Sequence, residues 1–597
     1  MFSKKIAAFI LAAGLCITNI GFSQTLEENW NDFLHYTAIG RFDLAKSYAQ
    51  AILQSNPDPV QLFNISREDP QDYEFLLKMK DIAPDPELAD LAGKILDVID
   101  RGNFILRTDP AVIVGEIKML STTDRGWMIA VRRLHDAGEY AIPFMLDAMA
   151  DPARQDEFDN IARALPEIGK DAIRPLADAL QTSNISIKSQ IIIALGDIKY
   201  PQSLPYLKYV LENDDLADFR DLAVKSITRI DPAALKVPAA QLFYQLAESY
   251  YYHAQSLSPA EDAPTANIWF WDSQQQKLTR EAVAKGYFNE LMAMRCCEWA
   301  LKADGKFGQA IGLWIASFFK AESAGVGKMP EYFGPDHADA LVYATTAGVE
   351  YLQQALARAI RDKNAYVALG VIEALGTTAG EKSLMYQLGL EQPLIKALSF
   401  DNRMVRYSAA IAIGAAGPME PFVESKLVVA NLAEAIGPQP ATDETTEGWT
   451  EEIADSYALR AATVMYKLAQ TRNPVINLSL AQAALINAVK DKRPQIQILA
   501  GRTLAHLNNS GAQRAIAEMA LDTDNSGEVR IAAFDSLATS AKLNANMLPD
   551  ETIDGIYALI KSNQTEPELR AAAAAAFGSL NLPSQKAKEL ILDQAKS

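Results

Sequence analysis

Hydrophobic side chains recur along this chain with the spacing of one face of a short helix. Between Asp401 and Gly417, the residues Val405, Ala409 and Ile413 stand four positions apart and therefore share one stripe. Asp401 belongs to a residue type that caps helix starts, and Gly417 to one that ends helices. The stretch predicts a short helix whose small Ala409 lets a second helix pack closely.

The same stripe returns at later positions, which predicts a repeat. It is formed by Val367, Val371 and Leu375; by Ile496, Ala500 and Leu504; by Val529, Ala533 and Leu537; and by Leu569, Ala573 and Phe577. We therefore predict repeat helices over residues 337–436 and 453–597. The acidic, proline-containing segment 437–452 lacks the pattern and predicts a linker or long loop.

Residues 111–232 carry the repeat in a form that places a glycine and a proline between two apolar helices. The motif stands as Gly138, Ala141 and Pro143; as Gly169, Ala172 and Pro175; and, with departures, as Tyr200, Ser203 and Pro205. These units resemble HEAT repeats of the type found in phycobilisome-lyase relatives, as they occur in exported bacterial proteins. The resemblance implies an all-α fold, a right-handed α-solenoid of stacked helical pairs, and brings no known activity with it.

Two further regions, 24–110 and 233–325, resemble tetratricopeptide (TPR) helical hairpins. In the first, Gly40 is followed by the small residues Ala45 and Ala49 at the spacing of a helix crossing. The second region is interrupted where Trp269 and Trp271 alternate with Phe270 before a polar turn. Strict alternation is typical of a strand, so we predict one small β-hairpin near 267–281.

Charge and the first residues bear on location and partners. The formal net charge is −19, which disfavours general nucleic-acid binding because phosphates would be repelled. Lys4 and Lys5 precede an apolar run, and the small Gly21 and Ser23 favour cleavage after residue 23. We predict a signal peptide at 1–23, a periplasmic or secreted protein, and no transmembrane span.

The residues needed for common catalytic and metal sites do not fall into their usual patterns. Past residue 23 the cysteines are the adjacent Cys296 and Cys297, which we expect to be buried as small hydrophobic side chains. None of the five histidines is followed by glutamate, as HEAT-repeat iron hydroxylases would require. The segment 522–530 starts like a calcium loop, but Ala533 stands where the last ligand belongs, so we expect a turn. We expect no catalytic residues, cofactor or metal.

Four arginines, Arg220, Arg406, Arg530 and Arg570, each follow the first apolar residue of a stripe. One interpretation is a ladder of cations for anionic ligands. The other, which recurrence at one structural position favours, is that each stem packs over a neighbouring repeat while the head meets an acid such as Asp401 or Asp524.

An aromatic cluster is the strongest candidate for partner binding, because aromatic side chains dominate interface hot spots. The predicted contact residues are Tyr250, Tyr251, Trp269, Phe270 and Trp271. The alternative is that these rings only pack, since a small hairpin needs aromatic packing to stay folded.

We predict an exported helical-repeat scaffold that binds one or more unidentified protein partners and has no catalytic activity of its own. Two alternatives remain open. The first is an enzyme or accessory factor of the HEAT-repeat lyase type, which would need titratable residues gathered in a groove. The second is a cell-envelope glycan-binding protein, which would need Trp269 and Trp271 to be exposed.

Overall fold

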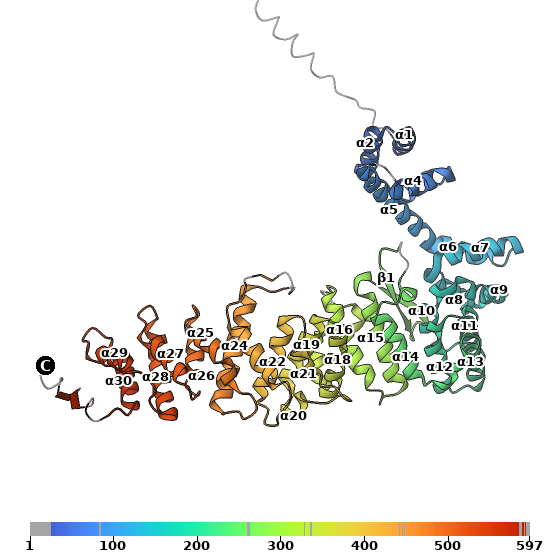
Figure 1. The fold of residues 1–597 in the computed structure, drawn as a ribbon. Helices are drawn as coiled ribbons and strands as arrows, with labels where there is room; N and C mark the ends of the chain where they lie inside the picture. Colours follow the sequence, from blue (N-terminus) through green and yellow to red (C-terminus); the bar gives the residue numbers. More distant parts are fainter. Residues whose placement is uncertain are drawn as a thin grey trace, which may run out of the picture. The chain divides into compact units, whose positions relative to one another are not determined.

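The structure is a computed structural model that describes residues 25–592, with gaps at 83–84, 260–262, 327–328, 335–336, 441, 444–445, 447, 584, 586–587 and 590. The predicted signal peptide lies outside the described residues. The chain divides into two compact units. Unit 1 spans Met1–Val237 and Ser258–Lys285, and unit 2 spans Pro238–Leu257 and Gly286–Ser597. Figure 1 shows the helical elements of both units along the chain.

Unit 1 consists of short helices that pack in pairs. They are α1 (Leu26–Ala38), α2 (Phe42–Gln54), α3 (Pro59–Ser66), α4 (Pro70–Ile82), α5 (Pro86–Thr108), α6 (Pro110–Met119), α7 (Asp124–Ala137), α8 (Ile142–Ala150), α9 (Phe158–Ala164), α10 (Ile173–Ala179), α11 (Ile185–Ile198), α12 (Leu204–Asn213) and α13 (Ala217–Ile230). The small Ala45 and Ala49 are fully buried, and α2 packs on α1. The predicted turn glycines Gly138 and Gly169 have φ angles of 59° and 75°, a region that favours glycine.

The predicted hairpin is present in unit 1. Its strands β1 (Ala266–Asp272) and β2 (Lys277–Val283) are antiparallel, with Trp269 opposite Arg280. β1 packs on α10, and β2 contacts both α8 and α10. Within unit 1 the hairpin is therefore a small sheet lying against the helical repeats.

Unit 2 continues the helical pairs over more than half of the chain. Its helices are α14 (Ala239–Tyr251), α15 (Lys285–Ala303), α16 (Gln309–Ser323), α17 (Ala340–Ala347), α18 (Val349–Arg361), α19 (Ala365–Thr378), α20 (Glu381–Leu384), α21 (Pro393–Ala397), α22 (Arg403–Ala416), α23 (Ser425–Ile436), α24 (Glu451–Gln470), α25 (Gln482–Ala488), α26 (Pro494–Leu504), α27 (Ser510–Leu521), α28 (Gly527–Asn544), α29 (Asp550–Lys561) and α30 (Pro567–Ser579). None of the described helices combines the length and the apolar character needed to cross a bilayer.

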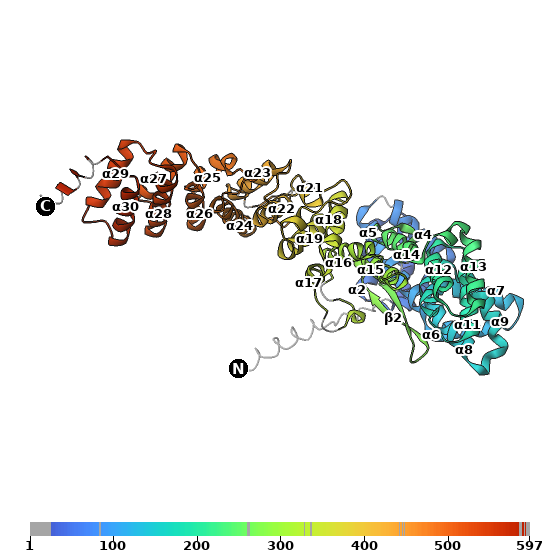
Figure 2. The ribbon, with the colours of Figure 1, turned by 90° about the horizontal axis from the view of Figure 1, so that it is seen from below.

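The helices of unit 2 form two rows, which are separated in Figure 2. One row holds α19, α22, α24, α26, α28 and α30, and each of these helices packs on the next. The other row holds α18, α21, α23, α25, α27 and α29. Stacked helical pairs of this kind make a solenoid, so the predicted all-α fold with one small hairpin is confirmed.

The predicted helix of the 401–417 stretch is α22, and its core stripe is fully buried or nearly so at Val405, Ala409 and Ile413. Gly417 ends it with a φ angle of 65°, as expected. The predicted cap is wrong by one residue: Asn402 accepts hydrogen bonds from the amides of Met404 and Val405. Asp401 instead pairs with the Lys363 ammonium at 2.9 Å, in solvent.

The four recurrent arginines bind main-chain carbonyl groups at the turn that precedes their own helix. Each guanidinium donates to these carbonyl oxygens at 2.6–3.2 Å: Arg220 to those of Asp214 and Asp215, Arg406 to those of Phe400 and Asp401, Arg530 to that of Ala520, and Arg570 to those of Ser562 and Thr565. The carboxylates of Asp401 and Asp524, named as possible acceptors, are not the groups used. Arg406 does pair with an acid of a neighbouring helix, since its guanidinium lies 3.0 Å from the Glu434 carboxylate of α23. A guanidinium satisfies carbonyls that a helix end leaves without partners, so these arginines fasten the repeat turns.

The segment predicted as a linker at 437–452 carries a buried side chain at its end. Trp449 is 4% exposed, stacks on Tyr457 with ring centroids 6.1 Å apart, and donates its indole N–H to the Pro440 carbonyl. This part of the segment is therefore packed against α24.

Candidate functional site

Two of the predicted contact residues belong to the core of unit 2. Tyr250 and Tyr251 of α14 are both buried, and the Tyr250 ring meets Phe288 of α15 edge-on. The ammonium of Lys320 lies 4.5 Å from the centre of the Tyr251 ring and donates to the Tyr251 carbonyl at 2.6 Å. Burial raises the pKa of Tyr251. In this arrangement neither ring has the surface needed for partner contact.

The hairpin residues belong to unit 1, and Trp269 is its anchor. This side chain is 3% exposed, and its indole N–H donates to Glu139 at 2.8 Å. Glu139 also accepts from the Asn267 amide at 2.7 Å and pairs with the Arg174 guanidinium at 3.0 Å. Trp269 is therefore a packing residue in the described fold. Phe270 and Trp271 remain partly exposed, and their role in binding stays a prediction.

We expect Glu139→Gln to release the hairpin locally. Glutamine lacks the charge that pairs with Arg174, and its amide N–H₂ group would face a donor, either Trp269 or Asn267. Losing a buried charged partner costs about 2 kcal/mol. Hydrogen exchange of the β1 amides should therefore become faster, while exchange in α22 stays unchanged.

The exposed Glu167 of the same unit supplies the control, because Glu167→Gln removes an equal charge from solvent. Equal exchange in both variants would mean that Glu139 does not anchor the hairpin.

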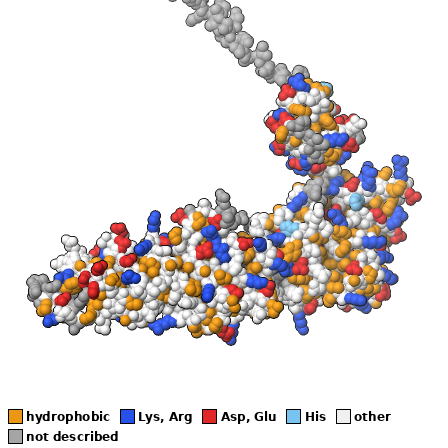
Figure 3. All heavy atoms as spheres, viewed as in Figure 1, with side chains coloured by type: hydrophobic (Ala, Val, Ile, Leu, Met, Phe, Trp, Pro, Cys, Tyr) orange, Lys and Arg blue, Asp and Glu red, His pale blue; other side chains and the backbone are white. Residues whose placement is uncertain are grey.

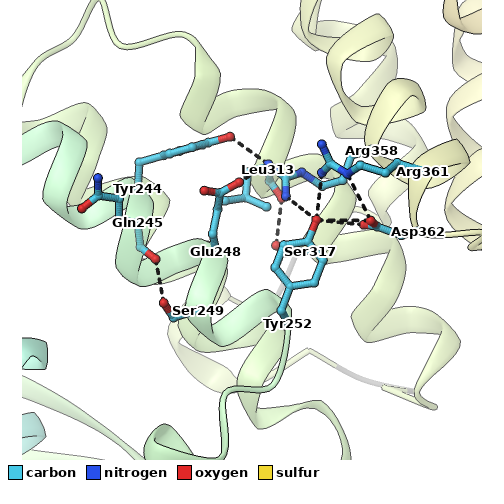
Figure 4. A network of polar contacts seen from close by, with 10 residues as sticks. All are labelled: Tyr244, Gln245, Glu248, Ser249, Tyr252, Leu313, Ser317, Arg358, Arg361 and Asp362. Carbon is cyan, nitrogen blue, oxygen red and sulfur yellow. Dashed lines mark hydrogen bonds and ion pairs between the residues drawn. The ribbon is translucent and has the colours of Figure 1, made fainter.

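A network of polar contacts joins α14 to α18 within unit 2, as Figure 4 shows. The buried guanidinium of Arg358 donates to Glu248 at 2.7 Å, to the Tyr244 hydroxyl at 2.8 Å and to the Tyr252 hydroxyl at 2.9 Å. Burial lowers the pKa of Arg358, but Glu248 and the two tyrosines raise it more, so its net pKa lies above the ordinary value.

The Tyr252 hydroxyl links this network to solvent, because it accepts from Arg361 at 2.8 Å and donates to Asp362 at 3.1 Å. A cavity of about 280 Å³ lies beside the network, lined by Tyr244, Gln309, Gly312, Leu313, Gln354, Ala357, Arg358, Arg361 and Leu388. Both arginines are neutralised by the neighbouring Glu248 and Asp362. We therefore assign this network to the fold of unit 2.

A larger cavity, of about 620 Å³, is lined by residues of α16 and α17 and of the first three helices of the row that starts with α19. We call it the acidic cavity. It is lined by Phe319, Glu322, Val326, Asp339, Leu341, Tyr366, Leu369, Gly370, Glu373, Ser408 and Tyr457. These residues come from α16, α17, α19, α22 and α24 and from the segments before α17. The described residues of the lining include three carboxylic acids and three aromatic rings, and none of them is a lysine, arginine or histidine.

Two of the three carboxylates that line the acidic cavity have only backbone partners among the described residues. Glu322 accepts from the Ala340 amide at 2.8 Å, and Asp339 caps α17 by accepting from the Val342 amide at 3.0 Å. Among the described residues, neither carboxylate forms an ion pair. Burial raises the pKa of Glu322, and the nearby Asp339 raises it further. A cation bound here would stabilise the charged form of Glu322 and so offset both effects on its pKa.

The third carboxylate of the lining, that of Glu373, is partly neutralised. Glu373 lies 3.7 Å from the Arg460 guanidinium, in an exposed pair, and Arg460 also lies over the Tyr457 ring at 5.5 Å. Exposed pairs of this length contribute little to stability. The contact does show that a guanidinium fits between an acid and an aromatic ring of this lining.

Two buried hydroxyls also line the acidic cavity. Ser408 and Tyr457 are 6% and 8% exposed, and their oxygens are 3.0 Å apart. One contact uses only one of the two hydroxyl protons, because each hydroxyl carries one donor. Among the described groups the second proton has no acceptor. This second proton is available to an acceptor that enters the cavity.

Sequence reasoning did not find the acidic cavity. Its residues are spread from 319 to 457 and stand next to one another only because successive helices stack. A local signal exists for Asp339 alone, as the first residue before a helix, and it indicates capping. No motif could have united these side chains.

Other candidate chemistry from the sequence has a structural explanation. Cys296 and Cys297 are fully buried, as expected, and they are not joined in a disulfide. At 522–530, Ser526 accepts from the Val529 amide and starts α28, which fits the predicted turn. Across the described ranges no group of three His, Cys, Asp or Glu side chains is placed to hold a metal ion.

Comparison with known proteins supports the repeat assignment in part of the chain. Residues 140–228, from α8 to α13, match the family model of HEAT repeats. No curated protein sequence matches the chain.

Solved structures with some similarity include an engineered protein, Kap95p in its action on RanGDP, and Kap121p bound to Pho4p. They are 14%, 11% and 12% identical, and the alignments cover 88%, 85% and 88% of this chain. The chain spans 99% of the engineered protein but only 66% of Kap95p and 57% of Kap121p. The TM-scores are 0.23, 0.25 and 0.27, which do not establish a common superposition.

Proposed function

We propose that this chain is an exported scaffold that binds a protein partner through unit 2, with no catalytic activity of its own. The observation that carries the proposal is the acidic cavity, which opens on a row of stacked helices and combines unpaired charge with aromatic rings. Stacked repeats offer extended surfaces, and recognition at such surfaces depends on a few anchoring pockets.

One face of unit 2 supports binding at a defined place. On the face drawn in Figure 3, the hydrophobic side chains of unit 2 lie scattered among charged and other polar ones. Broad association through one large apolar patch is therefore not favoured on this face. A pocket that selects by charge and shape fits the surface better.

Photocrosslinking at a single cavity residue tests this proposal. Tyr366 lines the cavity and is 49% exposed, so Tyr366→p-benzoylphenylalanine places a crosslinker at its mouth. We expect one discrete protein adduct in the cell-envelope fraction. The same crosslinker at Leu480, which is 57% exposed and lies outside the cavity, should give none.

Two outcomes would contradict the proposal. Identical adducts at Tyr366 and Leu480 would mean that capture is unspecific. If the chain itself is found outside the cell-envelope fraction, the proposed export is wrong. A crosslinker at Trp271 tests the hairpin separately, and an adduct there alone would move the binding site to unit 1.

A further inference from the structure

The acidic cavity has features that define the chemistry of its occupant. This inference rests on the proposed binding function and asks which group of a partner enters the cavity. Three observations bear on it: the charge of the lining, the rings beside that charge, and the pair of hydroxyls that lines the cavity.

The charge selects a cation. Glu322 and Asp339 have no ion-pair partner among the described residues, while the chain as a whole carries a net charge of −19. The surrounding field therefore concentrates cations rather than anions. The same two carboxylates act on Tyr366. Burial raises the pKa of this side chain, and the charges of Glu322 and Asp339 raise it further.

The rings select a cation with an organic surface. Phe319, Tyr366 and Tyr457 line the cavity together with Leu341 and Leu369. A hydrated inorganic ion would leave these apolar walls uncovered. An alkylammonium or guanidinium group covers them with its stem while its head meets the carboxylates and the ring faces.

The hydroxyl pair adds a requirement for an acceptor. The second hydroxyl proton of Ser408 and Tyr457 is available to an oxygen in the cavity. A peptide carbonyl next to a basic side chain supplies that oxygen, whereas a free amine does not.

We propose that the acidic cavity binds a lysine or arginine residue of an extended segment in the partner protein. The basic head lies between Glu322, Asp339 and the aromatic rings, and a main-chain carbonyl of the same segment accepts from the Ser408–Tyr457 pair. The volume of about 620 Å³ is sufficient for one such residue with its flanking backbone.

The test uses the full chain and capped tripeptides with the sequence Gly-X-Gly, in which X is Arg, Lys, norleucine or Glu. Saturation-transfer NMR detects weak binding to a protein of this size, and a single anchor predicts a Kd of about 1 mM. We expect signals from the Arg and Lys peptides. The norleucine and Glu peptides, which lack the cation, should give none.

Matched variants locate the site without removing its structural hydrogen bonds. In Glu322→Gln combined with Asp339→Asn, both side chains keep an acceptor oxygen for the Ala340 and Val342 amides. Asparagine also caps helices as well as aspartate does. Binding of the Arg peptide should fall by about tenfold or more. In Glu528→Gln, which removes an exposed charge elsewhere in unit 2, it should not change.

The thermal unfolding of the double variant separates loss of binding from loss of fold. Since the pKa of Glu322 is raised, the fold favours its protonated form, and this contribution to stability is lost as pH rises through that pKa. Removing the charge should therefore leave the melting temperature unchanged or slightly higher at neutral pH.

Tyr457→Phe tests the acceptor requirement. This substitution should weaken binding of the Arg peptide by about threefold. Binding of n-butylguanidine, which has no carbonyl, should not change. If n-butylguanidine binds as tightly as the peptide, the cavity takes free organic cations and the proposal is wrong.

Equal binding of the norleucine peptide would also overturn the proposal, as would unchanged binding in the double variant. These failures are distinct from failure of the scaffold function. If a specific adduct forms at Tyr366 but no peptide gives a saturation-transfer signal, the proposed binding function stands and only the proposal of a basic occupant is wrong.

Discussion

Ala409→Glu should unfold the central stack of unit 2. Ala409 is fully buried in α22, which packs between α19 and α24, so a glutamate there has neither space nor a cationic partner. Burial of an unpaired charge together with overpacking costs about 5 kcal/mol or more, which is comparable to the stability of a whole domain. Circular dichroism during heating should show early loss of helix, and limited proteolysis should cut within α19–α24.

Ala415→Glu is the matched control. Ala415 lies on the same helix but is exposed, and its carbonyl accepts from the Lys467 ammonium. Its substitution should change the free energy of unfolding by about 0.5 kcal/mol or less. If both variants melt like the parent protein, the register assigned to α22 is wrong.

Arg358→Met should produce the second largest loss of stability. Methionine fills similar volume, but it removes the guanidinium that donates to Glu248 and to the Tyr244 hydroxyl. The Tyr252 hydroxyl loses one of its two donors and keeps Arg361. Removal of one partner from a buried ion pair costs about 3–5 kcal/mol. Because Glu248 is about one third exposed and partly hydrated, we expect about 3 kcal/mol from urea unfolding.

Two further substitutions separate charge from geometry. Arg361→Met removes a guanidinium that is mostly in solvent, and it should cost less than about 1 kcal/mol. Arg358→Lys keeps the charge but cannot reach three acceptors at once, so it should recover only part of the loss. Equal stability of Arg358→Met and Arg361→Met would mean that the network does not stabilise unit 2.

The sequence predicted the elements that depend on local pattern. The stripe at Val405, Ala409 and Ile413 became the buried face of α22, since periodicity alone decides which side of a helix is apolar. The turns at Gly138 and Gly169 followed from the backbone freedom of glycine. The hairpin followed from alternation of large rings.

The functional interpretation was harder because it depends on distant residues. Trp269 looked like a contact residue, but Glu139, 130 positions earlier, holds its indole N–H. Arg406 was expected to meet an acid such as Asp401, but the carboxylate that it pairs with is that of Glu434, 28 positions later. The carboxylates of Glu322 and Asp339 come to line one cavity only when α16 and α17 pack together. Local sequence carries none of these contacts.

The arginine fasteners of the repeat turns have a consequence for how such a chain changes over generations. Arg530 and Arg570 each hold carbonyls near their own helix, so each unit brings its fastening with it. A duplication or deletion that joins equivalent points of two units would preserve every turn and every interface between neighbours. The solenoid is thus free to lengthen or shorten by whole units, while a site built across five helices, such as the acidic cavity, fixes the number of units around it.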